Sequence, residues 1–514
     1  MVAYIVRRLG VLLLILFGSS FILYNLAAIS GDPLEALRTS SDPSAKQQII
    51  TLTRELHLDV PPPARYFIWL RGILALFAGH IDFGNARNGQ AVSTMVQHAI
   101  PVTFRLVTMA TIVAMVLGIT IGIVTALRQY SRFDYAMTFL SFLMYSLPVF
   151  WVAVLLKQYL AIRFNTFLAN PSVPPGWIAI FSVVTGVVWA GIISGNRQRV
   201  IKIFAIVAVG NALLLELLSL THWFIHPGLG PIVLVGAGVG VAYGVTQVSV
   251  GLNNKPALHA SLSMAAASLV TYYPSQYLFK HSPHFTTLLV MEIFTLGLGA
   301  GVGRFFARVD RGPVIRTSII TGFIISLLMF LDKLMQTWSP YMQTDAINGR
   351  PVPTIGQSNA LLDQSDFWMS TLDTLMHLIL PTIALTLISF AGYVRFTRGT
   401  LLEVLNADYI RTARAKGLTE RTVIMRHAFR NTLIPLTTII VVDFAGIIGG
   451  AIITESVFGW VGMGTLFRQA ISSFDLNLLM AVFFITASLS VLANLIADLL
   501  YSALDPRIRV GAGK

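Results

Sequence analysis

The chain has 514 residues, of which 55% are apolar and 11% charged, with a formal net charge of +13 and no cysteine. Its apolar share exceeds the roughly 45–50% of soluble domains, and many of its apolar runs reach the ~20 residues that a helix needs to cross a bilayer. The lack of cysteine excludes disulfides and thiolate metal sites. Because excess Lys and Arg in a membrane protein normally lie in cytoplasmic loops, the charge indicates orientation and not nucleic-acid binding.

The first predicted membrane helix follows a pair of basic residues. Its apolar run, Leu9 to Ile29, is longer than the roughly 7–15 residues of a signal-peptide core, so we expect a retained helix. Arg7 and Arg8 then place the N-terminus on the cytoplasmic side. Residues 31–100 follow as a polar outer segment with six basic and six acidic side chains.

Further apolar runs predict more membrane helices along the chain. They cover about residues 102–127, 135–162, 177–194, 203–220, 230–250, 257–273, 285–303, 314–331, 374–394, 432–453 and 479–502. The loops richest in Lys and Arg fall where a cytoplasmic side is expected, and segment 332–373 is placed outside. The pattern predicts an all-α polytopic protein of about twelve helices with both termini cytoplasmic, including the basic C-terminal segment 505–514.

Charge is concentrated in the inner loop that precedes the run 432–453. Residues 411–430 hold six Lys and Arg side chains against one acid. Residues 407–416 contain good helix formers, and Gly417 can end that helix in a left-handed conformation. Thr419 can cap a second helix, whose positive dipole end suits Glu420. We therefore expect a helix–glycine–helix elbow that another protein can grip.

Several stretches in this chain carry a family resemblance. "ARAKGL" (413–418) followed by "RHAFRNTLIP" (426–435) closely resembles the cytoplasmic EAA loop of bacterial ABC-transporter permeases, with the spacing of the dipeptide/oligopeptide permease branch. "YIVRRL", "GDP", "SLPVFWVAVLL", "ESVFGWVGMGTLFRQAI" and "NLIADLLYSALDPRIR" also look like that branch, in the same order. The resemblance covers residues 1 to about 162 and about 365 to 509.

The resemblance implies a type I ABC-importer core of six helices in the bacterial plasma (inner) membrane. Such a subunit pairs with a second permease, binds two cytoplasmic ATPases and receives peptide from an extracytoplasmic binding protein. It is not an enzyme and binds no cofactor directly, since the partner ATPases use ATP and Mg. The ATPase-coupling loop then comprises Ala413, Lys416, Gly417, Leu418, Thr419 and Glu420, of which Ala413, Gly417 and Leu418 are expected to sit at the elbow that docks into the ATPase groove.

Residues 163–345 have no counterpart in the usual permease. The chain is therefore divided into an N-terminal helix and outer segment (1–98), a first core part (99–162), a six-helix membrane insertion (163–345) and a second core part (346–509) with the EAA loop at about 395–435. We expect the insertion to pack on the lipid side, acting in partner docking or stability without lining the path.

Single residues in the membrane runs and outer loops suggest further sites. Asp443 follows the elbow, where the family lines its path, and is a candidate path residue. The segment 455–478 is expected to form a short lid helix or re-entrant element, with Phe458, Trp460 and Gly462 as a candidate outer gate. Glu292 is expected to bond a neighbouring helix. Four outer-loop histidines, His222, His226, His281 and His284, have spacings that suit metal ligands, but their aromatic surroundings favour an interfacial belt.

Other functions remain open on the sequence. A twelve-helix secondary transporter driven by an ion gradient is the main alternative, although the internal repeat common in that class is not apparent. A membrane scaffold without transport is a third reading. Within the resembling family, nickel, glutathione or haem could replace peptide as cargo, because cargo choice rests largely with the binding protein. The expected partners also include membrane lipid and exclude nucleic acid.

Overall fold

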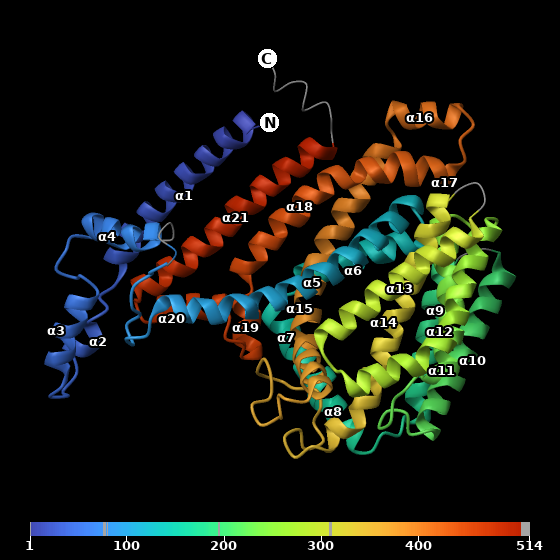
Figure 1. Ribbon diagram of the computed structural model, residues 1–514, viewed down its shortest axis with the longest axis horizontal. Coiled ribbons are helices and arrows are strands. Elements are labelled where there is room, and N and C mark those ends of the chain that lie inside the picture. The colour runs from blue at the N-terminus through green and yellow to red at the C-terminus, as the bar shows by residue number, and fades with distance from the viewer. Residues whose placement is uncertain (1, 76–78, 80, 194–195, 308–310, 505–514) are drawn as a thin grey trace. The chain divides into compact units, whose positions relative to one another are not determined.

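The computed structural model describes residues 2–75, 79, 81–193, 196–307 and 311–504, and helices account for its regular structure (Figure 1). No β-strand occurs within these ranges, and ten of the helices described there are long and apolar enough to cross a membrane. The predicted all-α polytopic membrane protein is therefore confirmed. The expected inner C-terminal segment 505–514 lies outside the described residues.

Cα packing divides the chain into two units. The first comprises residues 1–160, 354–357 and 377–514, and the second comprises residues 161–353 and 358–376. Helices that lie wholly in the first unit are α1 (Val2–Ser30), α2 (Glu35–Arg38), α3 (Ala45–Glu55), α4 (Pro62–Leu74), α5 (Val92–Leu127), α6 (Arg132–Ser146), α7 (Val149–Leu156), α16 (Asp408–Ala415), α17 (Glu420–Thr422), α18 (Phe429–Gly450), α19 (Ile452–Phe458), α20 (Met463–Ser472) and α21 (Leu476–Leu504).

The predicted membrane runs fall on helical segments of the structure. The prediction of one continuous helix over 135–162 is wrong. That stretch is broken into α6, α7 and a π-helical turn, η2 (Lys157–Ile162). The break falls at Pro148, which has no N–H to continue the hydrogen-bond ladder and forces the preceding residue out of the helical region. Leu147 accordingly has an extended backbone, with ψ at 129°.

Helix α5 approaches α15 (Phe367–Leu405) closely along the part of α15 that belongs to the first unit. A Cβ added to Gly118 would lie 2.5 Å from Tyr393 Cβ, and one added to Gly122 would lie 3.0 Å from the carbonyl oxygen of Val394. Small residues at such crossings let two membrane helices pack backbone to backbone. These glycines therefore set the spacing of the helix pair that supports the inner loop.

The second unit holds α8 (Arg163–Ala169), α9 (Pro175–Ile193), α10 (Arg197–Leu220), α11 (Gly230–Ser249), α12 (Lys255–His281), α13 (Phe285–Phe306) and α14 (Arg311–Gln343). Helix α9 packs against α10, and α11 to α14 pack against one another. As expected, Glu292 bonds a neighbouring helix, since its Oε2 accepts a hydrogen bond of 2.6 Å from Ser326 on α14.

The membrane run predicted over 314–331 is longer in the structure, because α14 continues through Asp332 to Gln343. Asp332 lies within α14 and is fully buried. Its Oδ1 accepts from the backbone N–H groups of Leu229 and Gly230 at 2.7 and 3.1 Å, where α11 begins. Its Oδ2 accepts from the hydroxyl of Tyr272 on α12 at 2.7 Å. One carboxylate therefore ties three helices of the second unit together.

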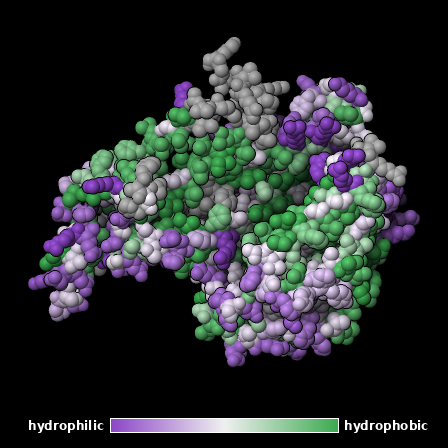
Figure 2. Space-filling view, viewed as in Figure 1, coloured by the Kyte–Doolittle hydropathy of each residue, from purple (hydrophilic) through white to green (hydrophobic). Residues whose placement is uncertain are grey.

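The surface of the first unit has polar and apolar parts. Figure 2 shows hydrophilic side chains gathered over α16 and over α2 and α3, whereas the visible surface along α1 and α21 is largely hydrophobic. Such an apolar band is what helices in contact with lipid require. The inner-loop helix α16 thus presents a polar surface at the end of an apolar helix assembly.

Candidate functional site

The segment between α15 and α18 forms the predicted elbow. Helix α16 ends at Ala415, and Lys416 donates its N–H to Thr412 O at 3.0 Å. Gly417 then takes a left-handed conformation, with φ at +75°, and its N–H bonds Arg414 O at 2.9 Å. Thr419 caps α17 by accepting from the N–H of Thr422. The local geometry expected for Gly417 and Thr419 is therefore confirmed.

An ion pair closes the elbow across the glycine turn. Arg414 Nη2 lies 2.7 Å from Glu420 Oε1, and Arg414 Nε donates to Glu420 Oε2 at 3.2 Å. The hydrogen bond from Arg414 lowers the pKa of Glu420 below its usual range. Both side chains are well exposed, so the pair adds little to stability.

The inner face of the elbow packs on the first unit's own helices. Ile410 and Ala413 of α16 are buried together with Leu401, Val423 and Ala126, the last of these near the end of α5. Ala413 is only 6% exposed, so it supports the elbow from within. Its small side chain allows α16 to lie close to the core.

The outer face of the elbow is exposed. Lys416, Gly417, Leu418, Thr419 and Glu420 all lie at the surface. Leu418 is 40% exposed, which leaves an apolar side chain unburied among charged neighbours. A protruding apolar side chain on a rigid turn is a suitable anchor for a partner's pocket.

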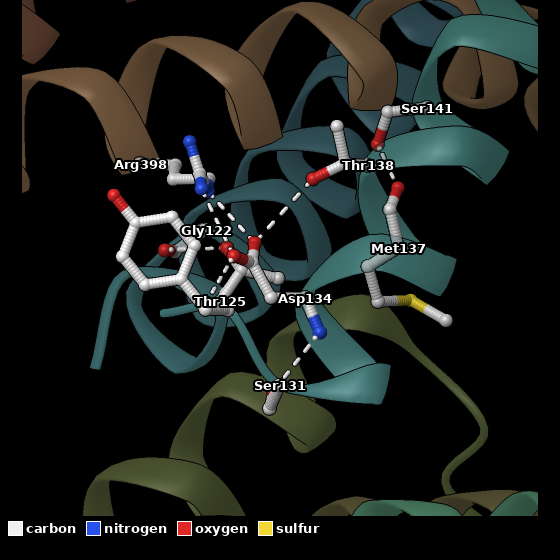
Figure 3. A network of polar contacts seen from close by, with 9 residues as sticks. Gly122, Thr125, Ser131, Asp134, Met137, Thr138, Ser141 and Arg398 are labelled. Carbon is white, nitrogen blue, oxygen red and sulfur yellow. Dashed lines mark hydrogen bonds and ion pairs between the residues drawn. The ribbon is translucent and has the colours of Figure 1, made fainter. Parts of the chain in front are cut away.

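A buried ion pair lies beneath the elbow, between α6 and α15 (Figure 3). Arg398 donates to both carboxylate oxygens of Asp134, from Nε at 2.8 Å and from Nη2 at 2.9 Å. Asp134 is 2% exposed and also accepts from Tyr130 N at 3.0 Å. The N–H of Asp134 in turn donates to Ser131 Oγ, which caps α6. This bidentate geometry fixes α6 against the helix that leads into the elbow.

Sequence reasoning missed this pair, although part of its signal is local. The spacing Ser131-x-x-Asp134 at the start of a helix is close to a capping box, so the cap at Ser131 could have been predicted from the sequence. Nothing in the sequence indicated Arg398, which lies 264 positions away. One turn earlier in α15, Arg395 lies 4.2 Å from the ring centre of Tyr145 on α6, a cation–π contact that reinforces the same attachment.

The candidate path residue Asp443 lies on α18 and is half-buried. Tyr393 of α15 lies near enough to interact electrostatically with it. The two side chains form a polar site between membrane helices. Whether cargo contacts Asp443 stays a prediction.

The outer segment 455–478 contains two short helices, α19 and α20, where a lid helix or re-entrant element was expected. The candidate gate residues Phe458 and Trp460 are each 2% exposed, so both are packed within the unit. Gly462 is buried too, and a Cβ there would collide with Thr103 Oγ1 and Glu455 Oε1. Thr103 Oγ1 donates to Glu455 Oε1 at 2.6 Å, which holds α19 against α5.

A lysine that sequence reasoning passed over braces the same segment. Lys157, in the π-helical turn after α7, donates from Nζ to Val457 O at 2.9 Å. Its ammonium also lies 5.8 Å from the centre of the Phe458 ring. An amine inside an apolar helix signals a specific partner, and here that partner is the carbonyl at the end of α19.

The four outer-loop histidines form no metal site in the structure. Within the described residues, no group of three or more His, Asp or Glu side chains is arranged to hold a metal ion. His281 stacks on Tyr277 with ring centres 4.0 Å apart, as an interfacial aromatic cluster does. His222, His226 and His284 lie in the turns before α11 and α13.

Comparison with known proteins identifies the family. Residues 293–510 match the family described as "Binding-protein-dependent transport system inner membrane component". The chain is 36% identical over 230 residues to the dipeptide transport system permease protein DppB of Escherichia coli, covering 42% of this chain and 68% of that protein. It is 38% identical over 188 residues to the oligopeptide transport system permease protein OppB of Mycobacterium tuberculosis, covering 37% of this chain.

The matches leave part of each relative unaligned. The chain spans 55% of the length of the mycobacterial OppB. It is also 46% identical over 136 residues to the oligopeptide transport system permease protein AppB of Bacillus subtilis, covering 26% of this chain and 43% of that protein. The relatives are membrane transport components and not enzymes, which agrees with the expectation from the sequence. The chain belongs to the family of binding-protein-dependent transport system inner membrane components, the ABC-transporter permease family that its motifs resemble.

Proposed function

We propose that this chain is the permease subunit that forms half of the translocation path of an ATP-driven importer for di- and oligopeptides. The observation that carries the proposal is the elbow of residues 408–428, whose exposed turn contains the left-handed Gly417 and is bridged by the Arg414–Glu420 pair. The relatives are named as dipeptide and oligopeptide permeases, and this supports peptide as the cargo.

The proposed partners follow from this role. A second permease subunit completes the path, two cytoplasmic ATPases use ATP and Mg, and an extracytoplasmic protein delivers peptide. Leu418 and its neighbours Lys416 and Thr419 enter the ATPase groove, while Ala413 sets the height of the elbow above the membrane helices. Both termini and the elbow then lie on the cytoplasmic side.

The proposed path uses the first unit. Asp443, which is half-buried on α18, offers a polar contact to peptide. The segment of α19 and α20 acts on the outer side, with Phe458 and Trp460 released from their packing when the path opens. The boundaries 1–98, 99–162, 163–345 and 346–509 remain our proposed division, with the middle segment as an insertion outside the path.

The test is reconstitution of transport. The chain, purified together with the second permease and the two ATPases, is placed in liposomes and supplied with a labelled tripeptide and the binding protein. We expect uptake that requires ATP and persists when a protonophore removes the ion gradient. Uptake that needs the gradient and not ATP would instead identify a secondary transporter, and failure of the ATPases to co-purify would contradict the role of the elbow.

A further inference from the structure

The second unit contains an apolar pocket that lies outside the proposed path. It lies among α12, α13 and α14 and has a volume of about 590 Å³. This is within the roughly 300–1,000 Å³ typical of small-molecule sites. Side chains such as Met264, Leu288 and Phe330 make its wall largely apolar. The pocket is large enough for an alkyl chain.

One polar group in this pocket is not satisfied. Glu292 lines it, and its Oε2 accepts the hydrogen bond from Ser326. The other oxygen, Oε1, is buried and has no hydrogen-bond partner within the described part of the chain. A carboxylate near the middle of a membrane helix costs about 2.5–3.5 kcal/mol on insertion scales, and a buried oxygen left without a donor adds to that cost.

The other polar side chains of the wall cannot supply the missing donor. Hydroxyl groups of the wall already donate to backbone carbonyl groups of their own helices: Ser268 to Ala265 O, Thr271 to Ala267 O, Ser275 to Thr271 O and Thr295 to Met291 O. Ser326 bonds the opposite oxygen of Glu292. The pocket therefore presents Glu292 Oε1 as a hydrogen-bond acceptor, which suits a ligand with a hydrogen-bond donor.

The charge of the side chains that line the pocket restricts the class of ligand further. No Lys, Arg or His side chain lines the pocket among the described residues, so nothing there would balance a phosphate or a carboxylate. A cation, by contrast, is attracted to the Glu292 carboxylate, and strongly so in a medium of low dielectric constant. The rim side chains Phe294 and Phe323 are 62% and 48% exposed, and both are apolar. A ligand would thus enter from an apolar phase.

We propose that the second unit binds a lipophilic amine, a molecule with one alkyl chain and a protonated primary amine, whose ammonium donates to Glu292 Oε1. The alkyl chain occupies the apolar pocket between α12, α13 and α14. The site lies outside the elbow, the candidate path residue and the outer segment. It gives the unit a ligand-binding role that is separate from peptide translocation.

The experiment measures binding of radiolabelled dodecylamine to the purified chain in nanodiscs of zwitterionic lipid, with empty nanodiscs subtracted. Dodecanoic acid, which has the same chain length and the opposite charge, is the matched probe. Three variants are compared with the wild type. Glu292→Gln removes the charge, Ala267→Phe fills the pocket, and Glu216→Gln makes the same change on an exposed position of α10 that does not line the pocket.

We expect saturable dodecylamine binding by the wild type and by Glu216→Gln. Binding by Glu292→Gln should be about tenfold weaker or more, because a hydrogen bond to a charged group is stronger than one between neutral groups. Ala267→Phe should abolish it, with size-exclusion profiles showing that each variant is folded. Equal binding of dodecanoic acid, or unchanged dodecylamine binding by Glu292→Gln, would overturn the proposal.

Discussion

The left-handed turn at Gly417 allows a sharp test of the elbow. No atom outside the immediate backbone lies within 4 Å of a Cβ built on this glycine, so a side chain there has open space around it. The φ of +75°, however, lies in a region that residues with a Cβ rarely adopt. A substitution at this position therefore changes the backbone preference of the turn without changing its packing.

Valine and asparagine separate these effects. A non-glycine residue in the left-handed region costs roughly 1–2 kcal/mol, and a β-branched residue is a true outlier there, whereas asparagine tolerates it. Gly417→Val should therefore shift the elbow away from its closed turn by a factor of about 5 to 30. Gly417→Asn places a side chain of similar size at the same position with a much smaller penalty.

The assay is co-purification of the ATPases with each variant, followed by peptide uptake in liposomes. We expect Gly417→Val to lose ATPase attachment and uptake roughly in proportion to the shifted turn, while membrane insertion and the melting of the chain alone stay normal. Gly417→Asn should retain most of both. Equal loss by the two variants would mean that any side chain blocks the contact, and normal uptake by Gly417→Val would refute the reasoning.

Three more predictions concern the supports of the elbow and the outer segment. Asp134→Asn leaves Arg398 without its carboxylate and should lower the free energy of unfolding by about 2–3 kcal/mol. This is less than the roughly 3–5 kcal/mol of a fully buried pair, because Arg398 is 28% exposed. Adding Arg398→Gln should recover part of the lost thermal stability, and an unchanged melting temperature of Asp134→Asn would contradict the role of the pair. Val461→Cys, at a position 58% exposed, should react with an impermeant maleimide added outside, whereas Gly462→Cys should not, and labelling of Val461→Cys only from the cytoplasm would reverse our topology. Burial raises the pKa of Asp475 above 3.8, so the folded chain holds the proton of this carboxyl more tightly than the unfolded chain does. The stability of the fold should therefore decrease as pH rises from about 3.8 through the raised pKa. Asp475→Asn should remove this pH dependence from thermal unfolding measured at several pH values.

Local signals in the sequence predicted the elbow well. The positive φ at Gly417 and the cap at Thr419 depend on a few neighbouring residues, so a short motif is enough to predict them. Ala413 belongs to the same motif, but its burial with Leu401 was not predicted, since it depends on how α16 folds back on α15. A motif identifies the residues of a turn, but the surrounding fold decides which face each one presents.

Pairs between distant segments were beyond sequence reasoning. Arg398 and Asp134 are 264 positions apart, and Lys157 and Val457 are 300 apart. Each pair exists because helices that are remote in the chain pack together, and one chain without relatives aligned to it carries no signal of which polar residues will meet. The break at Pro148, in contrast, was available from the sequence, because proline and its preceding residue resist the helical conformation.

The position of Asp332 shows what a hydropathy argument leaves out. Such an argument assigns each side chain the cost of leaving water alone, so the predicted membrane run ended at residue 331, just before this carboxylate. In the structure α14 continues to Gln343, because the cost is offset by hydrogen bonds that the assembled unit supplies. Two of these come from backbone N–H groups at the start of α11, which have no acceptor within their own helix and are favoured by the helix dipole. Glu292 differs in this respect: its Oε2 accepts a hydrogen bond from Ser326, but its buried Oε1 has no hydrogen-bond partner within the described residues.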